Sequence, residues 1–185
     1  MKMIEVIQYS DEEFESQFVP MIEDTYIEIQ GLLENVPEKL RLKFTDNGGS
    51  DITGVGGFAF SHDQINLAVL KSFHDRSLQK KNLRSAFFHE SFHLQQGFTY
   101  ADSPFTALDA AIYEGSAIKF ERDYGNNDPV YGDYSAYSDE QLRQWLDEIR
   151  AIGAEYFEKE DTWRKWAFYH PEYDEKWIVY KVGGF

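Results

Sequence analysis

The chain of 185 residues contains no cysteine. Disulfide bonds and thiolate metal sites are therefore excluded, and any metal ion must be held by histidine, aspartate or glutamate. Basic residues are also scarce, since 18 lysines and arginines stand against 33 aspartates and glutamates and give a net charge of −15. This excess of negative charge repels phosphate backbones and anionic lipids, so we expect neither nucleic acid nor a membrane as partner.

Long apolar runs are missing as well. No stretch of the sequence approaches the roughly 18 apolar residues of a membrane span, and the N-terminal segment lacks the apolar core of a signal peptide. We therefore expect a cytoplasmic protein. The hydrophobic share of 42% and the aromatic share of 17% argue against disorder, and the length fits one domain.

Helix and strand patterns alternate in the first half of the chain. Apolar residues recur at helical spacing over residues 11–35, where we expect Pro20 to interrupt or start a helix. Alternating patterns predict strands over residues 40–45, 54–60 and 63–70.

The second half of the chain, from about Ser77, is predominantly helical. We expect helices over residues 78–96 (closed by Gly97), 104–123 (with Ser103 as N-cap and Pro104 in the first turn), 138–157 and 162–168. This order predicts a single α+β domain with an α/β lobe over residues 1–100 and a helical lobe over residues 101–185.

A His-Glu-x-x-His motif at residues 89–93 is the most informative segment. On a helix, His89 and His93 lie about 40° apart and about 6 Å along the axis, so both imidazoles can bind one zinc ion. Glu90 is rotated by about 100° from His89 and can act as a base beside the metal. Alternatively, the two histidines are core residues satisfied by backbone carbonyls.

The other faces of this predicted helix indicate how it packs. Aromatic and aliphatic residues flank the histidines, so we expect the histidine face to point into the interior. Arg84, Ser91 and Gln95 form a polar stripe almost opposite, which we expect to face water. The two histidines that precede this helix, His62 and His74, are expected at the surface.

A catalytic zinc site needs a third protein ligand, and Glu114 is the best candidate. It follows His93 by 21 positions and shares a helix face with several alanines, where a carboxylate is costly unless it has a counter-charge. Small neighbours would also let this helix approach another closely. The alternatives for Glu114 are an ion pair with a buried arginine or lysine, or simple exposure.

The motif HESFH, followed by Glu114-Gly-Ser-Ala, resembles the gluzincin branch of the thermolysin-like zinc metallopeptidases. More narrowly, the chain resembles a family of bacterial predicted zinc-dependent proteases of undefined function. A strand such as residues 64–68 precedes the metal helix in that family, and an aromatic-glycine motif similar to residues 177–183 follows it. The similarity covers roughly residues 55–185.

The resemblance implies a zincin-like fold, with a small mixed or antiparallel sheet packed on the active-site helix. It implies a zinc metallopeptidase with His89, His93 and Glu114 as Zn²⁺ ligands and Glu90 as general base, acting through a metal-activated water. It further implies that the strand over residues 64–70 pairs with an extended peptide or protein substrate.

Two features remain to be assigned from the resemblance. Tyr180, from the late motif, is the first candidate for stabilising the oxyanion, and His170 is the second, although either can serve packing alone. Some relatives carry an aspartate at the position of Ile118, so another group, such as Asp109, Asp123 or a backbone carbonyl, must orient the histidines here.

Two other functions stay open from the sequence. The chain can be a catalytically weak or inactive zincin-like domain that binds a protein or ligand. It can also be an aromatic-rich ligand-binding module whose histidines are incidental. Retention of Glu90 favours the peptidase, because a structural zinc has no use for a base.

Overall fold

The computed structural model describes residues 3–8, 12–125, 127–152 and 160–185. It divides into two compact units: Met1–Asp102 with Asp123–Asn127, and Ser103–Arg122 with Asp128–Phe185. The division after Asp102 falls two residues from the lobe boundary expected from the sequence. The expected α+β class is confirmed, because the first unit carries a mixed sheet and the second is mainly helical.

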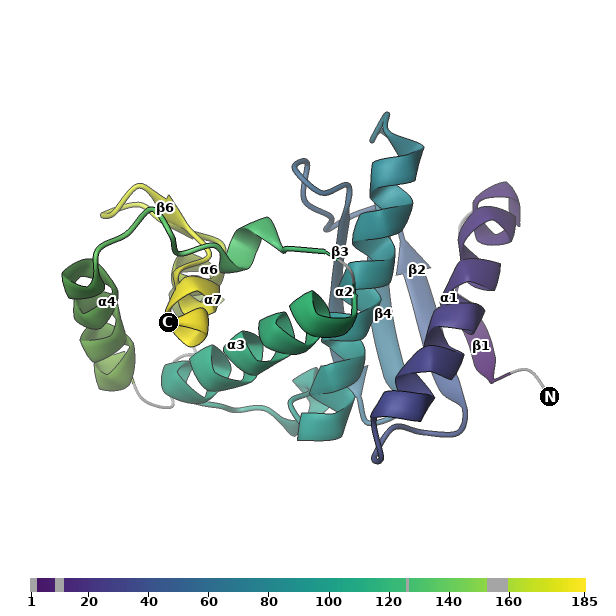
Figure 1. Ribbon diagram of the computed structural model, residues 1–185, viewed down its shortest axis with the longest axis horizontal. Helices are drawn as coiled ribbons and strands as arrows, with labels where there is room; N and C mark the ends of the chain where they lie inside the picture. Colours follow the sequence, from purple (N-terminus) through teal and green to yellow (C-terminus); the bar gives the residue numbers. More distant parts are fainter. Residues whose placement is uncertain (1–2, 9–11, 126, 153–159) are drawn as a thin grey trace. The chain divides into compact units, whose positions relative to one another are not determined.

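The first unit is built on a four-stranded sheet with two helices. The strands lie in the order β1-β2-β4-β3, with β1, β2 and β4 parallel to one another and β3 antiparallel to β4. Figure 1 shows the two helices on one face of this sheet. The bounds are β1 Ile4–Gln8, α1 Glu12–Leu32, β2 Leu40–Thr45, β3 Val55–Ser61, β4 Gln64–Val69 and α2 Arg76–Gln96.

The core of this unit lies between the sheet and the two helices. Alternate residues of β2 are buried, as expected for a strand with one face covered. Residues with no exposed surface come from α1, β2, β4 and α2: Ile22, Tyr26, Ile29, Leu40, Leu42, Ile65, Leu67, Leu83 and Phe87. Their burial fixes α2, and hence the histidine motif, against the sheet.

The strands predicted over residues 40–45, 54–60 and 63–70 are confirmed within one residue at each end. The prediction that Pro20 interrupts or starts a helix is wrong, because α1 continues through it. A proline inside a helix costs about 3 kcal/mol, whereas each fully buried large apolar side chain contributes about 1.5–3 kcal/mol. Phe18 and Ile22, both at most 1% exposed, flank the proline and outweigh its cost.

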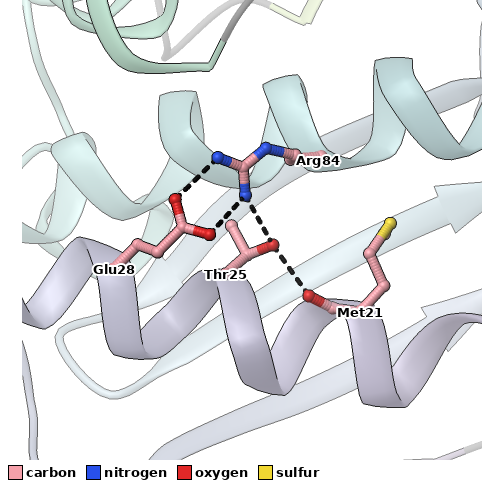
Figure 2. A network of polar contacts seen from close by, with 4 residues as sticks. All are labelled: Met21, Thr25, Glu28 and Arg84. Carbon is pink, nitrogen blue, oxygen red and sulfur yellow. Dashed lines mark hydrogen bonds and ion pairs between the residues drawn. The ribbon is translucent and has the colours of Figure 1, made fainter.

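Helix α2 is tied to α1 by a polar network (Figure 2). The Arg84 guanidinium donates from Nη1 and Nη2 to the two carboxylate oxygens of Glu28, at 3.1 and 2.7 Å. Nη1 also donates to Thr25 Oγ1 at 3.1 Å, and this hydroxyl donates to the Met21 carbonyl at 2.7 Å. The paired contact joins the two helices in a defined geometry, because a planar guanidinium matches a carboxylate in only a few orientations.

The expectation that the polar stripe of α2 faces water is therefore wrong. Arg84 binds α1, Ser91 has no exposed surface, and Gln95 accepts a hydrogen bond from the Asn35 backbone N–H at 2.8 Å. The stripe packs against α1 and the segment that follows it. Helical spacing predicted which residues share a face, but not that a second helix covers that face.

The second unit is mainly helical. Its elements are most of α3 (Ala107–Tyr124), the 3₁₀ turn η2 (Val130–Gly132), α4 (Asp139–Ile152), α6 (Glu160–Ala167), the two-residue strands β5 (Tyr169–His170) and β6 (Glu175–Lys176), and α7 (Ile178–Gly184). The helix predicted over residues 138–157 is described only as far as Ile152, and the rest of that prediction lies outside the described residues. No helix was predicted at the position of α7.

The sequence predicted the C-terminal end of α2 correctly, but not the residue that caps the start of α3. Gly97 closes α2 with a left-handed φ of 69°, as predicted. Ser103 does not cap α3, because the helix begins at Ala107 and its cap is Thr106. The Thr106 hydroxyl accepts from the Asp109 N–H, and the Asp109 carboxylate accepts from the Thr106 N–H, both at 3.0 Å. This reciprocal arrangement is a capping box.

No helix among the described residues combines the length and the apolar character that crossing a lipid bilayer requires.

Candidate metal centre

The start of α2 is anchored to the turns that flank β3 and β4. Asp75 caps the helix by accepting from the Leu78 N–H at 2.9 Å. The side-chain amide of Gln79, which has no exposed surface, donates to the carbonyls of Gly54 and Leu70, both at 2.8 Å. These contacts fix where the helix begins, and therefore which turn of α2 carries the histidine motif.

His89 and His93 lie on the buried face of α2, as the sequence predicted, with 4% and 3% of their surface exposed. Their rings are nearly perpendicular, with an angle of 86° and a centroid separation of 4.7 Å. The two Nε2 atoms are 3.0 Å apart. Two nitrogens bound to one tetrahedral zinc at 2.0–2.1 Å lie about 3.3 Å apart, so this pair fits one ion with a small adjustment.

The hydrogen bonding of His93 favours the form that binds a metal. Its Nδ1 lies 3.0 Å from Gln96 Oε1, and this oxygen can only accept, so Nδ1 carries the proton. With the proton on Nδ1, Nε2 offers its lone pair toward His89. Gln96 is thus an orienting partner for His93, outside the set considered from the sequence (Asp109, Asp123 or a backbone carbonyl). Its position three residues after His93 on the same helix could have indicated it.

Glu90 lies against the edge strand β3. Its side chain is 7% exposed. A Cβ added at Gly57 would come within 3.1 Å of Glu90 Cγ and 3.1 Å of Leu67 Cδ2, so the missing side chain leaves room for the Glu90 stem. Sequence analysis did not single out Gly57, because the contact joins residues far apart in the chain.

The strand beside Glu90 is not the one expected to pair with a substrate. Both neighbours of β4 are occupied, by β2 on one side and β3 on the other, so the predicted pairing of residues 64–70 with a peptide is wrong. In the part of the chain that the structure describes, β3 is the edge strand at this end of the sheet. Strand order depends on contacts between distant segments, and the local pattern does not encode it.

The register of β3 shows which backbone groups face outward. The Leu70 N–H donates to the Gly54 carbonyl at 2.9 Å, which makes residues 54 and 70 a hydrogen-bonded pair. Because such pairs alternate in an antiparallel ladder, Gly57 and Ala59 direct their N–H and C=O groups away from β4. Gly57 is exposed and therefore offers a backbone donor and acceptor at this edge, whereas Ala59 is only 4% exposed.

Glu114 is a half-buried residue of α3. The adjacent Gly115 permits backbone contact with α7, since a Cβ there would lie 2.0 Å from the Gly183 carbonyl oxygen. A Cβ on Gly183 would in turn lie 2.0 Å from the Ala111 carbonyl oxygen. The expectation that small residues let the Glu114 helix approach another helix closely is confirmed, and the approach to α7 uses this glycine pair.

One ligand atom from each of His89, His93 and Glu114 can be chosen so that all three lie within 4.8 Å of one another. His89 and His93 belong to the first unit and Glu114 to the second, and the role of Glu114 as third ligand stays a prediction. Two neutral imidazoles and one carboxylate are a donor set that suits zinc and leaves a coordination position open.

Tyr180, the first candidate for stabilising an oxyanion, lies on α7 and is partly exposed. Its ring packs edge-on against Tyr131 with a centroid separation of 5.4 Å. Its role stays a prediction.

His170, the second candidate, is only 1% exposed and packs between Trp166 and Tyr173, with both centroids 4.5 Å away. Neither ring nitrogen has a hydrogen-bond partner among the described residues. Burial lowers the pKa of this ring below its usual value. These observations fit the packing alternative that the sequence left open. His62 and His74 are exposed, as predicted.

A comparison of the chain with protein-family models, with curated proteins and with solved structures finds no match. The resemblance of its motifs to zinc metallopeptidases therefore rests on the residues themselves, and the function has to be argued from the chemistry of His89, Glu90, His93 and Glu114.

Proposed function

We propose that the chain is a zinc-dependent metallopeptidase. The observation that carries the proposal is the convergence of His89 Nε2 and His93 Nε2, which lie 3.0 Å apart. Beside them on α2 lies the buried carboxylate of Glu90, which is not one of the three proposed ligands. A pair of core histidines would need neither the open donor set nor this carboxylate.

His89, His93 and Glu114 hold Zn²⁺ in this proposal. Bound zinc polarises a peptide carbonyl and lowers the pKa of water toward about 7. Gln96 keeps the His93 proton on Nδ1, so that Nε2 is free to coordinate.

Glu90 acts as the general base. Its carboxylate accepts a proton from the attacking water while the water oxygen bonds to the carbonyl carbon of the substrate. The same carboxylate then delivers that proton to the leaving nitrogen as the C–N bond breaks. Tyr180 is retained as the candidate donor to the oxyanion, and the buried His170 is not.

The substrate is an extended peptide that adds a strand to β3. The outward backbone groups of the exposed Gly57 supply hydrogen bonds for an added strand, and a Cβ at Gly57 would lie 3.1 Å from Glu90 Cγ. A peptide bond aligned on this edge would therefore lie beside the base.

Zinc content tests the ligand assignment. We expect stoichiometric zinc in the wild-type chain and in His62→Ala, which removes an exposed histidine, but loss of zinc in His89→Ala. Zinc retained by His89→Ala would contradict the proposed centre.

Cleavage of fluorescein-labelled casein tests the reaction. We expect Glu90→Gln to keep its zinc and to lose cleavage by about a hundredfold or more, because the amide cannot accept the proton. Zinc binding without cleavage in the wild-type chain would instead support the non-catalytic zincin-like domain. Cleavage that survives Glu90→Gln would refute the base.

A further inference from the structure

Three aromatic side chains form an exposed cluster at the edge strand of the first unit. Phe58 and Phe60 of β3 are 46% and 36% exposed, and Tyr100 of the 3₁₀ turn η1 (Tyr100–Asp102) is 63% exposed. Phe60 stacks on Tyr100 with centroids 5.9 Å apart and an interplanar angle of 17°. Phe58 meets both other rings edge-on, at 6.4 and 6.1 Å. We call these three residues the aromatic cluster.

The cluster adjoins the strand segment that contacts Glu90. Phe58 follows Gly57 directly, and side chains of a strand alternate between the two faces of the sheet. Gly57 and the buried Ala59 lie on the face covered by α2, so Phe58 lies on the opposite face, opposite Asn66 of β4. The cluster thus begins one residue along β3 from the glycine that faces Glu90, on the other face of the sheet.

An added strand would bring substrate side chains to these rings. Every second side chain of a peptide paired with β3 falls on the face that carries Phe58, at intervals of about 6.5–7 Å. A large apolar side chain at that point removes ring surface from water, whereas a charged side chain would lose hydration without gaining a partner.

We propose that the aromatic cluster binds a large apolar side chain of the substrate and so makes the chain selective for peptides with leucine, phenylalanine or a similar residue next to the cleaved bond. This inference rests on the proposed function, because it takes the peptide along β3 as its occupant. Phe58, Phe60 and Tyr100 act as specificity-determining residues.

Peptide binding to the zinc-loaded Glu90→Gln chain tests the inference, because this variant holds substrate without cleaving it. The probes are fluorescent ten-residue peptides that are identical except at one position, which carries leucine, serine or aspartate in turn, and the position is moved along the peptide. We expect leucine to bind about tenfold more tightly than serine or aspartate at one position in fluorescence anisotropy.

Variants of the cluster complete the test. We expect Phe58→Ser with Tyr100→Ala to lose the preference for leucine while keeping stoichiometric zinc. Phe168→Ser provides the matched control, since Phe168 is 50% exposed and lies in the second unit. Equal affinities for all peptides, a preference that survives in the double variant, or no measurable binding would overturn the inference.

The failure of this inference can be told from failure of the proposed function. If zinc binds and casein is cleaved without any preference for apolar residues among the products, the cluster assignment is wrong and the peptidase stands. If the chain holds no zinc and does not cleave casein, the proposed peptidase function is wrong, whatever the result of the peptide-binding measurements.

Discussion

The Nδ1 atom of His93 lies 3.0 Å from Gln96 Oε1, a contact that orients the imidazole. Removing such an orienting partner typically lowers metal affinity 10- to 100-fold, because the ring can rotate and change tautomer. We therefore expect Gln96→Ala to weaken zinc binding by about that factor, measured by competition with a zinc-chelating dye. Gln95→Ala is the control, since Gln95 accepts from the Asn35 backbone instead. Equal affinities of the two variants would contradict the role of Gln96.

His170 makes the stability of the second unit depend on pH. Burial lowers its pKa because the protonated ring would lose hydration, and Lys165 acts in the same direction against the weaker opposite effects of Glu172 and Glu148. The unfolded chain binds a proton near pH 6.5, before the folded chain does. The stability that the neutral ring provides is therefore complete above about pH 6.5 and is lost as the pH falls toward the lowered pKa.

Replacement of His170 by phenylalanine should remove this dependence. In the presence of a chelator, we expect Tm to fall less for His170→Phe than for the wild type between about pH 7.5 and about pH 5.5. We also expect the variant to be more stable at neutral pH by about 1 kcal/mol, since two unpaired buried nitrogens disappear. Parallel falls in Tm for both chains would show that other groups control the acid response.

At the scale of elements, two helices in the second unit meet backbone to backbone. Gly115 of α3 and Gly183 of α7 leave no room for a side chain at their contact, and Gly115 is adjacent to Glu114. The contact explains why the sequence carries a glycine directly after the predicted ligand and another near the end of α7. It fixes α3 lengthwise against α7, and with it the turn that carries Glu114.

Alanine substitutions should separate this contact from ordinary helix propensity. We expect Gly115→Ala to lower the free energy of unfolding by about 3 kcal/mol or more, because its Cβ would lie 2.0 Å from a backbone carbonyl that cannot move aside. Gly31→Ala in α1 should instead raise it by about 0.5–1 kcal/mol, because nothing lies within 4 Å of the added Cβ. Urea denaturation measures both; a neutral Gly115→Ala would contradict the close contact.

At the scale of the whole molecule, the net charge of −15 creates a negative field around the chain. This field should attract cationic peptides and repel acidic ones. We expect kcat/KM for a lysine-containing peptide to fall several-fold as the salt concentration rises, while an uncharged peptide of the same core sequence changes little, because salt screens the field. An equal response of both peptides to salt would show that the field does not steer substrate.

Local signals in the sequence accounted for a large part of the fold and of the candidate site. The spacing of apolar residues predicted the strands over residues 40–45, 54–60 and 63–70 and the helix ending at Gly97. The four-residue spacing of His89 and His93 predicted their convergence, because positions on one helix are set by its geometry alone.

Contacts between distant segments decided the rest. The position of β3 at the edge, its Gly57 against Glu90, the covering of the polar stripe by α1 and the contact of Gly115 with Gly183 follow from tertiary packing. A residue's neighbours along the chain fix its place on a helix or strand, but the choice of which surfaces meet depends on the shape and burial of the folded whole. The sequence by itself therefore named the candidate metal ligands, and only the tertiary structure decided which strand lies beside Glu90.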